Sequence, residues 1–437
     1  MCFTVHIEME RLTSVREALR AYMERLSQVL AEPEVEEIPV EEAVGRVLAE
    51  DIKAPIDLPP FDKAVMDGYA VRAQDTFGAR PDRPVKLKLV GRALAGHLGP
   101  PVGPGECVEV STGSMLPEGA DAVVRYEHAR DLGGTIEVLQ PVPPGSCVDK
   151  AGKDVKAGQV VLERGKSIRV PDMAVMLALG LRTVKVFRKP RVAVVSVGDE
   201  LVDAGAELEP GSGKVRDVDR PMVMELAREL GAEPVDLGIL PDDIGAIREA
   251  ISEALSKCDA VMTIGGASVG KPDLVLEALE GLEGIEVVVR RVSMRPGRPV
   301  ILALARRKPM ICLPGPPVAC FLAFQVFARP VLLRLAGIKH GLRALWPAIR
   351  TRLARRVPSR VGFTDLVRVR LFLGPDGDVL AEPVAMRGAG VLSSLVKANG
   401  ILLVPEEMDV LEEGSYVEVI PIGPFELVGG RPGGCGG

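Results

Sequence analysis

The spacing of hydrophobic residues predicts a helix near the start of the chain and short strands in the region that follows. Apolar side chains repeat at helical spacing through residues 12–31, where Ser14 and Glu17 have the spacing of a capping box. A second, short helical pattern covers residues 40–48. From residue 51 to about 187, β-rich runs alternate with Gly and Pro turns, which predicts a β-dominated region with few helices. The predicted strands of this region are 85–90, 107–110, 122–126, 135–138 and 160–162.

Strand and helix patterns alternate in the next part of the chain, which predicts a parallel, doubly wound sheet. From about residue 344 to 422 strands dominate again, with a hairpin turn at Asp376-Gly377. The glycine-rich tail after Phe425 is predicted to be disordered. The strands of the alternating part are predicted at 191–196, 235–239, 260–264 and 310–313. Its helices are predicted at 219–230, at 243–257 and, after the fourth strand, to about 335.

Length and composition narrow the class of protein. A chain of 437 residues is too long for one compact core and suggests two to four domains. The formal net charge of -6 argues against nucleic acid or an anionic membrane as the main partner. The seven cysteines form no CxxC pair, so neither a zinc cluster nor a disulfide framework is indicated.

The lack of a visible signal peptide or membrane-spanning run predicts a cytoplasmic protein. The N-terminus shows no signal peptide, and no apolar run approaches the ~20 residues that a membrane helix needs. Reduced thiols suit the same compartment. Asn399 is the only asparagine and charged residues are abundant, which would suit a thermophile.

Three predicted strands end in glycine-bearing loops, SVGDE, GGASVG and LPGPP, which open into helices. Open α/β sheets bind ligands beyond the carboxyl ends of their strands, where helix N-termini offer N–H groups that suit phosphate. Neither a Walker A motif nor a clean GxGxxG is present, so ordinary P-loop and dinucleotide sites are disfavoured. The loops therefore predict a ligand site of another kind, although any one glycine turn could be a simple tight turn.

Charged residues cluster in the same loops. The acids suggest Mg²⁺, which prefers one or two carboxylates together with substrate phosphate oxygens. An Asp at a helix start is also a common N-cap, and this reading stays open for Asp243. Arg295 and Arg298, on the stiff RPGRP loop, suit an oxyanion, or form a solvated surface turn. The acidic residues of the loops are Asp199, Glu200, Asp242, Asp243 and Asp273.

A collinear series of motifs runs along nearly the whole chain, from the first helix to about residue 422. In chain order the motifs are LPPFDKAVMDGYAV (58–71), STGSMLPEGADAVV (111–124), GKDVKAG (152–158), SVGDEL (196–201), TIGGASVGKPD (263–273), RPGRP (295–299) and LPGPPVA (313–319). This series closely resembles the motifs of the MoeA family of molybdopterin molybdenumtransferases, the group that includes the E domain of gephyrin.

The resemblance implies an α/β multidomain fold with a central doubly wound, mostly parallel sheet of the MogA type. β-rich N-terminal subdomains and a small C-terminal β-barrel-like domain complete it. The expected domains are 1–187 (helix 12–31, then subdomains at about 32–54 plus 142–187 and at 55–141), 188–337 (MogA-like), 338–424 (C-terminal) and the tail 425–437. The resemblance also implies an elongated homodimer whose active cleft is shared between the central domain of one subunit and the N-terminal region of the other.

The implied reaction takes adenylylated molybdopterin and molybdate and gives molybdenum cofactor and AMP, with Mg²⁺. Arg295 and Arg298 are then expected to hold the oxoanion with Ser196, while Asp62, Asp67 and Thr112 reach in from the partner subunit. For Asp62 and Asp67 a purely structural turn is the alternative. The expected catalytic residues are Asp62, Thr112, Asp154, Glu200, Asp242 and Asp273. Further expected substrate-binding residues, mostly through the backbone of the glycine loops, are Asp67, Gly198, Asp199, Gly265, Gly266, Ser268, Gly270, Pro314 and Gly315. The expected metal ligands are drawn from Glu200, Asp242, Asp243 and Asp273.

The chain departs from the family pattern at several positions. Pro316 and Ala319 stand where Asn and Ser are usual, Lys153 replaces a Glu, and Asp219 replaces an Asn. Arg295 and Arg298 stand where lysines are common.

Two other functions stay open. One is molybdopterin adenylylation, which MogA-type proteins carry out with the same central fold, and the other is a non-catalytic pterin-binding scaffold, for which Pro316 and Ala319 are the motive. The departures also leave tungstate open as the oxoanion. Expected partners are a MogA-type adenylyltransferase and a molybdoenzyme or chaperone.

Overall fold

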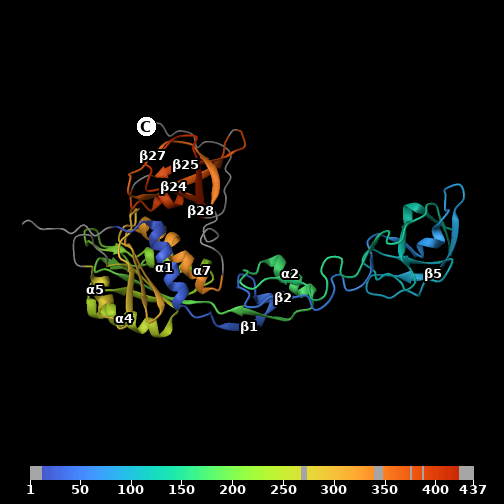
Figure 1. Cartoon of the computed structure of the whole chain (residues 1–437), viewed down its shortest axis with the longest axis horizontal. Coiled ribbons are helices and arrows are strands. Elements are labelled where there is room, and N and C mark those ends of the chain that lie inside the picture. The colour runs from blue at the N-terminus through green and yellow to red at the C-terminus, as the bar shows by residue number, and fades with distance from the viewer. Residues whose placement is uncertain (1–11, 267–272, 339–347, 375, 386–387, 423–437) are drawn as a thin grey trace, which may run out of the picture. The chain divides into compact units, whose positions relative to one another are not determined.

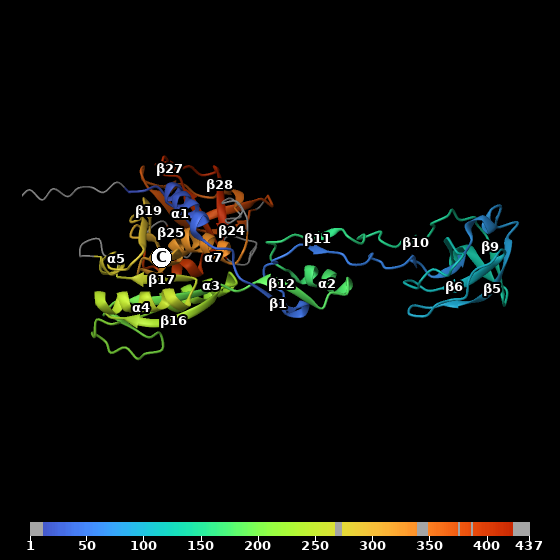
Figure 2. The ribbon, with the colours of Figure 1, turned by 60° about the horizontal axis from the view of Figure 1, so that its bottom comes forward.

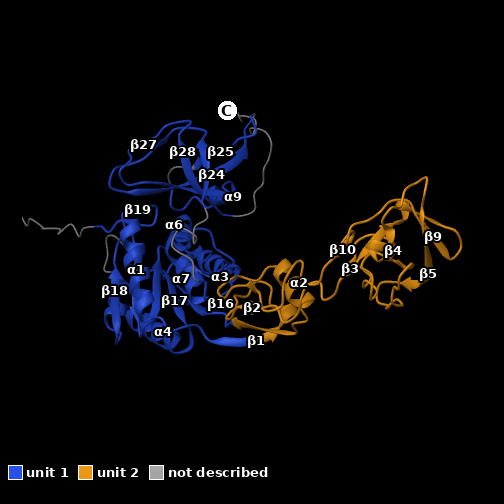
Figure 3. Ribbon diagram, turned by 45° about the vertical axis from the view of Figure 1, so that its right-hand side comes forward, with its two compact units in different colours: residues 1–36, 187–437 blue, residues 37–186 orange. Residues whose placement is uncertain are grey.

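The computed structural model divides into two compact units. It describes residues 12–266, 273–338, 348–374, 376–385 and 388–422. One unit comprises Glu37–Val186, and the other comprises Met1–Glu36 together with Phe187–Gly437 (Figure 3).

The smaller unit is built on a six-stranded sheet in the order β7-β4-β6-β5-β9-β8. Strand β4 lies antiparallel between β6 and β7, and a Cβ at Gly68 would collide with the carbonyl oxygen of Val124 on β7. The glycine of the DGYA motif is therefore required by sheet packing. The strands are β4 (Gly68–Val71), β5 (Val85–Ala93), β6 (Glu106–Val110), β7 (Ala122–Arg125), β8 (Ala129–Asp131) and β9 (Thr135–Val138). The strands predicted from the sequence in this sheet are thus confirmed.

Shorter elements complete the smaller unit and correct two predictions. The pattern at 40–48 gives only one 3-10 turn, η1 (Val40–Glu42). A helix that the sequence did not predict, α2 (Val170–Ala178), begins with a proline in its first turn, and Asp172 accepts a hydrogen bond from the Arg169 amide at 2.9 Å. The remaining elements are β2 (Ile52–Lys53), β3 (Lys63–Ala64), β10 (Val148–Asp149), β11 (Val160–Leu162), η2 (Ala73–Thr76) and η3 (Tyr126–His128), with β1 (Val35–Pro39) and β12 (Thr183–Phe187) at the boundary of the unit.

The larger unit contains the predicted doubly wound sheet, in the order β16-β13-β17-β21-β20-β18. The first four strands are parallel, whereas β20 runs antiparallel to both of its neighbours. Separate hydrophobic clusters cover the two faces, with α1, α3, α6 and α7 on one and α4 and α5 on the other (Figure 1, Figure 2). The strands are β13 (Arg191–Val197), β16 (Glu233–Leu240), β17 (Ala260–Gly265), β18 (Ile285–Val289), β20 (Ile301–Ala305) and β21 (Lys308–Leu313). The helices are α1 (Val15–Val29), α3 (Asp219–Glu229), α4 (Ile244–Lys257), α5 (Leu274–Glu280), α6 (Pro317–Ala323) and α7 (Arg329–Leu335), with a π-helical segment, Phe324–Ala328, between the last two.

The antiparallel edge of this sheet is a hairpin that sequence patterning missed. Strands β20 and β21 are joined by Arg306 and Arg307, which have φ values of 50° and 65°. Two central residues with positive φ are typical of a type I′ turn, which Asn and Gly normally supply. Because two arginines hold this turn, the sequence offers no hairpin signal.

Helix α1 begins at the capping box predicted from the sequence, in which Ser14 and Glu17 satisfy each other's backbone amides. The helix is fixed to the hairpin by Tyr22, which is fully buried. Its hydroxyl donates to the Ala303 carbonyl oxygen at 2.8 Å and accepts from the Met310 amide at 3.1 Å. One phenol therefore links the start of the chain to the centre of the sheet.

The C-terminal strands form a small closed barrel. Five strands follow the order β24-β25-β22-β28-β26, and β24 also pairs with β26, which closes the ring. The short strand β19 (Met294–Arg295), which follows the doubly wound sheet in sequence, adds in parallel to β24. The barrel strands are β22 (Ile349–Leu353), β24 (Thr364–Leu373), β25 (Val379–Ala385), β26 (Gly400–Val404) and β28 (Tyr416–Pro421), accompanied by β23 (Val357–Pro358), β27 (Val410–Leu411) and α9 (Ser393–Val396).

The continuous helical run Pro317–Leu335 is long and apolar enough to cross a membrane by length and composition, contrary to the reading of the sequence. Within the fold, 78 % of its apolar window is buried. A single helix of this kind is only weak evidence for a membrane span, because a buried core helix of a sheet domain can have the same length and composition. The tail after residue 422 lies outside the described residues.

Candidate functional site

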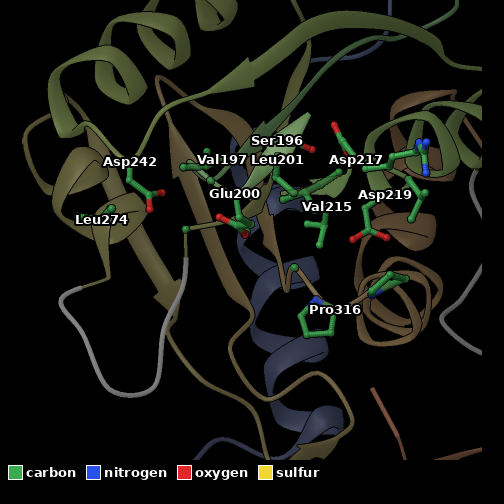
Figure 4. Close-up of a pocket in the computed structure, with 18 residues that line it drawn as sticks. Ser196, Val197, Glu200, Leu201, Val215, Asp217, Asp219, Asp242, Leu274 and Pro316 are labelled. Carbon is green, nitrogen blue, oxygen red and sulfur yellow. The ribbon is translucent and has the colours of Figure 1, made fainter. Parts of the chain in front are cut away.

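A cavity of about 760 Å³ opens at the carboxyl ends of the parallel strands β13 and β17 in the larger unit (Figure 4). This is the place where an open α/β sheet binds its ligand. The cavity is framed by the loop after β13, by the start of α3 and by the loop that joins β21 to α6. Seven residues that the sequence predicted for the site line it, namely Ser196, Gly198, Glu200, Asp242, Gly265, Gly266 and Gly315.

Close backbone packing accounts for the glycines at this end of the sheet. Gly265 has a φ of 82°, and a Cβ there would lie 2.6 Å from the Val197 carbonyl oxygen. Gly266, with a φ of 70°, would bring a Cβ to 2.6 Å from the Val275 side chain. Both glycines let the β17 loop turn tightly against β13 and α5. Ser268 and Gly270 of the same motif lie outside the described residues.

The predicted metal ligands do not form one group in the described part of the chain. Asp243 caps α4 by accepting from the Ala246 amide at 2.7 Å, and Asp273 caps α5 by accepting from the Leu276 amide at 3.1 Å. Burial raises the pKa of Asp273. Among the described residues, no three His, Cys, Asp or Glu side chains come together as a metal-binding group. Glu200 and Asp242 thus remain the candidate ligands that face the cavity.

The neighbours of these carboxylates serve as supports. Asp199 accepts a hydrogen bond from the Asp242 amide at 3.2 Å, which joins the loops after β13 and β16. Pro314, the first residue of the loop that follows β21, is buried.

The start of α6 offers fewer hydrogen-bond donors than the LPGPP motif suggested. Pro316 and Pro317 have no amide hydrogen, and the Val318 amide donates to the Ala389 carbonyl oxygen at 2.9 Å. Ala319 is buried and has no hydroxyl. Phosphate binding by free amides, expected here from the sequence, is therefore weakened at this helix.

The two arginines of the RPGRP loop lie apart from the cavity lining that the structure describes. Arg295 forms a bidentate pair with Asp365 on β24, with Nε to Oδ1 at 2.7 Å and an Nη to Oδ2 at 2.5 Å. Its guanidinium also lies 5.3 Å from the centre of the Phe363 ring. Arg298 is exposed. In this structure Arg295 links β19 to the barrel.

Three charged residues line the cavity that the sequence did not assign to the site, Arg216, Asp217 and Asp219. The Asp217 carboxylate binds Arg220, at 2.9 Å from its Nε. Burial and the charge of Asp217 raise the pKa of Asp219 to about 7. The one signal in the sequence was Asp219 itself, which replaces an Asn of the family pattern and starts a helix. Figure 4 shows Asp217 and Asp219 on one side of the cavity and Asp242 on the other.

Two buried polar atoms of the lining have no hydrogen-bond partner among the described residues, Ser196 Oγ and Asp219 Oδ1. Buried polar atoms are rarely left unpaired, because desolvation without a hydrogen bond costs about 1–3 kcal/mol. Their position in a cavity suggests that a ligand supplies the partners.

The LPPFDKAVMDGYAV motif lies in the smaller unit, where its two predicted site carboxylates are held in separate contacts. Asp62 pairs with Lys150 at 2.7 Å and accepts from the Ala151 amide at 2.9 Å. The hydrogen bond from Lys150 lowers the pKa of Asp62. Asp67 accepts from the amide and hydroxyl of Thr112 at 2.7 and 3.0 Å.

The GKDVKAG motif of the smaller unit is exposed at its three charged residues, Lys153, Asp154 and Lys156. The Asp154 side chain is solvent-exposed. Lys153, which replaces a Glu of the family pattern, pairs with Asp149 at 2.5 Å.

Comparison with known protein families covers most of the chain in three segments. Residues 13–180 match the MoeA N-terminal region (domain I and II), residues 193–334 match a probable molybdopterin binding domain, and residues 350–422 match the MoeA C-terminal region (domain IV).

Similar full-length proteins include enzymes named for one activity. A Methanocaldococcus jannaschii protein assigned by its name to molybdopterin biosynthesis is 34 % identical over 94 % of this chain and 98 % of its own. The molybdopterin molybdenumtransferase of Haemophilus influenzae is 31 % identical over 92 % of this chain and 97 % of its own. A crystal structure of a molybdopterin biosynthesis MoeA protein from Pyrococcus horikoshii has a TM-score of 0.79 and 36 % identity, covering 95 % of this chain and all of that one.

Proposed function

The chain belongs to the MoeA family, and we propose on this premise that it is a molybdopterin molybdenumtransferase of molybdenum cofactor biosynthesis. The proposed reaction inserts molybdate, or tungstate, into adenylylated molybdopterin and releases AMP. The observation that carries it is the cavity at the carboxyl ends of β13 and β17, which three of the collinear motifs build and where Ser196 Oγ and Asp219 Oδ1 have no partner among the described residues.

A divalent cation fits the charge of this cavity. Its described lining holds four carboxyl groups, Glu200, Asp217, Asp219 and Asp242, against one cation, Arg216. An anionic substrate would be repelled from such a lining unless positive charge entered with it. Mg²⁺ is suited to this role because it takes one or two carboxylates and keeps its other positions for water and phosphate oxygens. Glu200 and Asp242 are the residues proposed to hold it, and when bound it would offset the charge of the pyrophosphate.

The chain's own groups would bind and orient the substrate. The buried Ser196 hydroxyl is placed to donate to an oxyanion, and Gly265 and Gly266 allow the close approach of a ligand to backbone. Asp62, held as a carboxylate by Lys150, and Asp67 with Thr112 and Asp154 are proposed to enter the cleft from a second copy of the chain. A cytoplasmic homodimer that receives its substrate from a MogA-type adenylyltransferase and passes its product to a molybdoenzyme or chaperone completes the proposal.

One assay separates the proposed function from its alternatives. Purified protein is mixed with adenylylated molybdopterin, Mg²⁺ and either molybdate or tungstate, and AMP is measured. AMP release that requires the oxoanion is the expected result. Pterin binding without AMP release would instead support a scaffold, for which Pro316 and Ala319 are the motive. Consumption of ATP with unmodified molybdopterin would support an adenylyltransferase.

The shared cleft is tested by subunit complementation. Asp62→Ala and Glu200→Gln each disable one half of the proposed cleft, and Asp62→Ala should lower turnover without unfolding the protein. If the two halves come from different subunits, random mixing of the variants restores about a quarter of wild-type activity, because half of the dimers carry one intact cleft. No recovery after subunit exchange, confirmed by differently tagged chains, would show that each chain supplies a complete site.

A further inference from the structure

Asp219 occupies a position in the cavity that no contact within the chain explains. It is the first residue of α3 and is 7 % exposed, and its side chain lines the cavity. Its Oδ1 atom has no hydrogen-bond partner among the described residues. The side chain does not act as the cap of α3, whose N-cap, Val218, makes no side-chain hydrogen bond. A buried carboxyl group with an unused oxygen facing a cavity is poised for a ligand.

The cation closest in sequence is committed elsewhere. Arg220 donates through Nε to Asp217 at 2.9 Å and through an Nη to Asp203 at 2.8 Å, and it also pairs with Asp236 on β16. The guanidinium of Arg220 is therefore paired with three carboxylates other than Asp219. Asp219 is therefore left beside the Asp217 carboxylate without a cation of its own.

The other elements around Asp219 bring no compensating charge. Helix α6 contributes the fully buried thiol of Cys320, whose pKa is raised by burial and then by Asp219 and Asp217. Strand β13 contributes the uncharged Ser196. Elsewhere in the lining, Glu200 and Asp242 are exposed acids, and the guanidinium of Arg216 donates to the Ala206 carbonyl oxygen at 3.1 Å.

Burial and a neighbouring like charge both favour the neutral form of a carboxyl group. The two effects place the pKa of Asp219 at about 7. A neutral carboxyl group carries one O–H donor and one acceptor oxygen, whereas a carboxylate can only accept. An anionic ligand needs donors, and a second carboxylate beside Asp217 would repel it.

We propose that Asp219 keeps a proton and donates a hydrogen bond from its carboxyl group to the oxoanion in the cavity, alongside the Ser196 hydroxyl. The proposal rests on the proposed function in assuming that the ligand of this cavity is an oxoanion. It makes Asp219 a specificity-determining residue, since the protonated acid selects a hydrogen-bond acceptor. Oxoanion affinity then falls as the pH rises and Asp219 becomes charged.

The size of the effect follows from the protonated fraction. With a pKa of about 7, Asp219 is mostly protonated at pH 6.5 and almost fully ionised at pH 8.5. Apparent affinity scales with the fraction of protein in the competent state, so tungstate affinity should fall roughly twentyfold between these two pH values.

Calorimetric titration of the full chain with tungstate in the presence of saturating Mg²⁺ tests the proposal, with Asp219→Asn and Asp219→Leu as matched variants. The Asn variant keeps an amide donor at every pH, so its tungstate affinity should change less than about threefold across the range. The Leu variant has no donor and should bind weakly at both pH values. Equal pH dependence in the wild type and the Asn variant would overturn the role of Asp219, as would the absence of tungstate binding at pH 6.5.

Infrared difference spectra report on the proton itself without any ligand or turnover. The carbonyl band of a protonated carboxyl group should appear in the wild type at pH 6, disappear with a midpoint near 7, and be missing in Asp219→Asn. Glu200→Gln, an exposed acid of the same cavity, should keep the band. If the wild type releases no AMP while its band titrates and tungstate binds as expected, the proposed function is wrong and the role of Asp219 stands. Absence of the band in the wild type at pH 6 would show that Asp219 does not keep its proton.

Discussion

The pair between Arg295 and Asp365 gives the structure a sharp test, because the sequence predicted a different role for this arginine. The two residues are register partners on β19 and β24, and both oxygens of the carboxylate accept from the guanidinium. Ser359 adds a third hydrogen bond to Asp365 at 2.7 Å. We expect Arg295→Ala and Asp365→Ala to loosen the barrel, and the two changes to be strongly coupled.

Exposure sets the magnitude of this coupling. The Asp365 side chain is 12 % exposed and that of Arg295 is 37 % exposed. Exposed pairs contribute about 0–1 kcal/mol, and removing one partner of a fully buried pair costs about 3–5 kcal/mol. The Asp365 side chain is nearly buried while the arginine still reaches water, so a value between these two ranges applies. We expect Arg295→Ala to cost about 2 kcal/mol and the coupling energy to be about 1.5 kcal/mol.

Native-state hydrogen exchange of the β24 amides measures the opening free energy of the barrel in the two single variants and the double variant. Arg298→Ala is the matched control, since Arg298 lies on the same loop and is exposed, and it should change the opening free energy by less than about 0.5 kcal/mol. A coupling energy below about 0.5 kcal/mol would refute the structural role. Loss of tungstate affinity in Arg295→Lys without any change in hydrogen exchange would instead support the role predicted from the sequence, in which Arg295 binds the oxoanion.

Three further changes test the packing around the site. Tyr22→Phe should cost about 1–3 kcal/mol, because it removes the buried hydrogen bonds of the hydroxyl with the Met310 amide and the Ala303 carbonyl, and thermal unfolding measures the loss. Ser14→Ala should cost about 1 kcal/mol by removing the N-cap of α1, measured by denaturant unfolding; no change would show that packing alone fixes the start of this helix. Asp219→Asn should stabilise the protein relative to the wild type at pH 8 but little at pH 4. The raised pKa of Asp219 adds stability that is full below 3.8 and is lost as the pH rises through about 7, at most about 4 kcal/mol. If the difference in melting temperature between the two proteins is the same at pH 8 and at pH 4, the pKa of Asp219 is not raised.

The doubly wound sheet could be predicted because its strands are short apolar runs separated by amphipathic helices. Strand β13 is buried at nearly every position, and helix α4, between β16 and β17, has a clear cap and helical periodicity. The order of the strands at the antiparallel edge of the sheet could not be predicted from such patterns. The turn at Arg306 and Arg307 has positive φ at both residues without a Gly or Asn signal, so the hairpin β20-β21 had no local mark in the sequence.

Helix α2 escaped prediction for a related reason. Its nine residues are apolar around most of the circumference, so they show no amphipathic period. The start of the helix is fixed by Asp172, whose carboxylate accepts a hydrogen bond from the Arg169 amide and also pairs with Lys166 at 2.7 Å. A cap that works from inside the first turn is visible only when the fold brings its partners together.

The candidate site was predictable where backbone geometry determines the residue, and less so where a side chain had several possible partners. Gly265 is required by the close approach of the Val197 carbonyl oxygen, and its loop does border the cavity. Asp243 could cap a helix or bind a metal, and the spacing of one chain cannot distinguish the two. In the structure it is the cap. Arg295 pairs with Asp365, seventy positions later in the chain, because β19 adds to the barrel strand β24. No local motif in the sequence indicates this pairing.

The departures from the family pattern at Pro316, Ala319 and Asp219 lie on two elements that pack against each other, α6 and α3. The changes on α6 remove donors from the cavity end of that helix, an amide group at Pro316 and a hydroxyl at Ala319. The change on α3 exchanges an amide for a carboxyl group, which can still donate one hydrogen bond if burial keeps it neutral. The three departures are thus consistent with one another. Donors lost on α6 make the remaining donor on α3 more important, and its protonation then sets the pH range in which the cavity can hold an oxoanion.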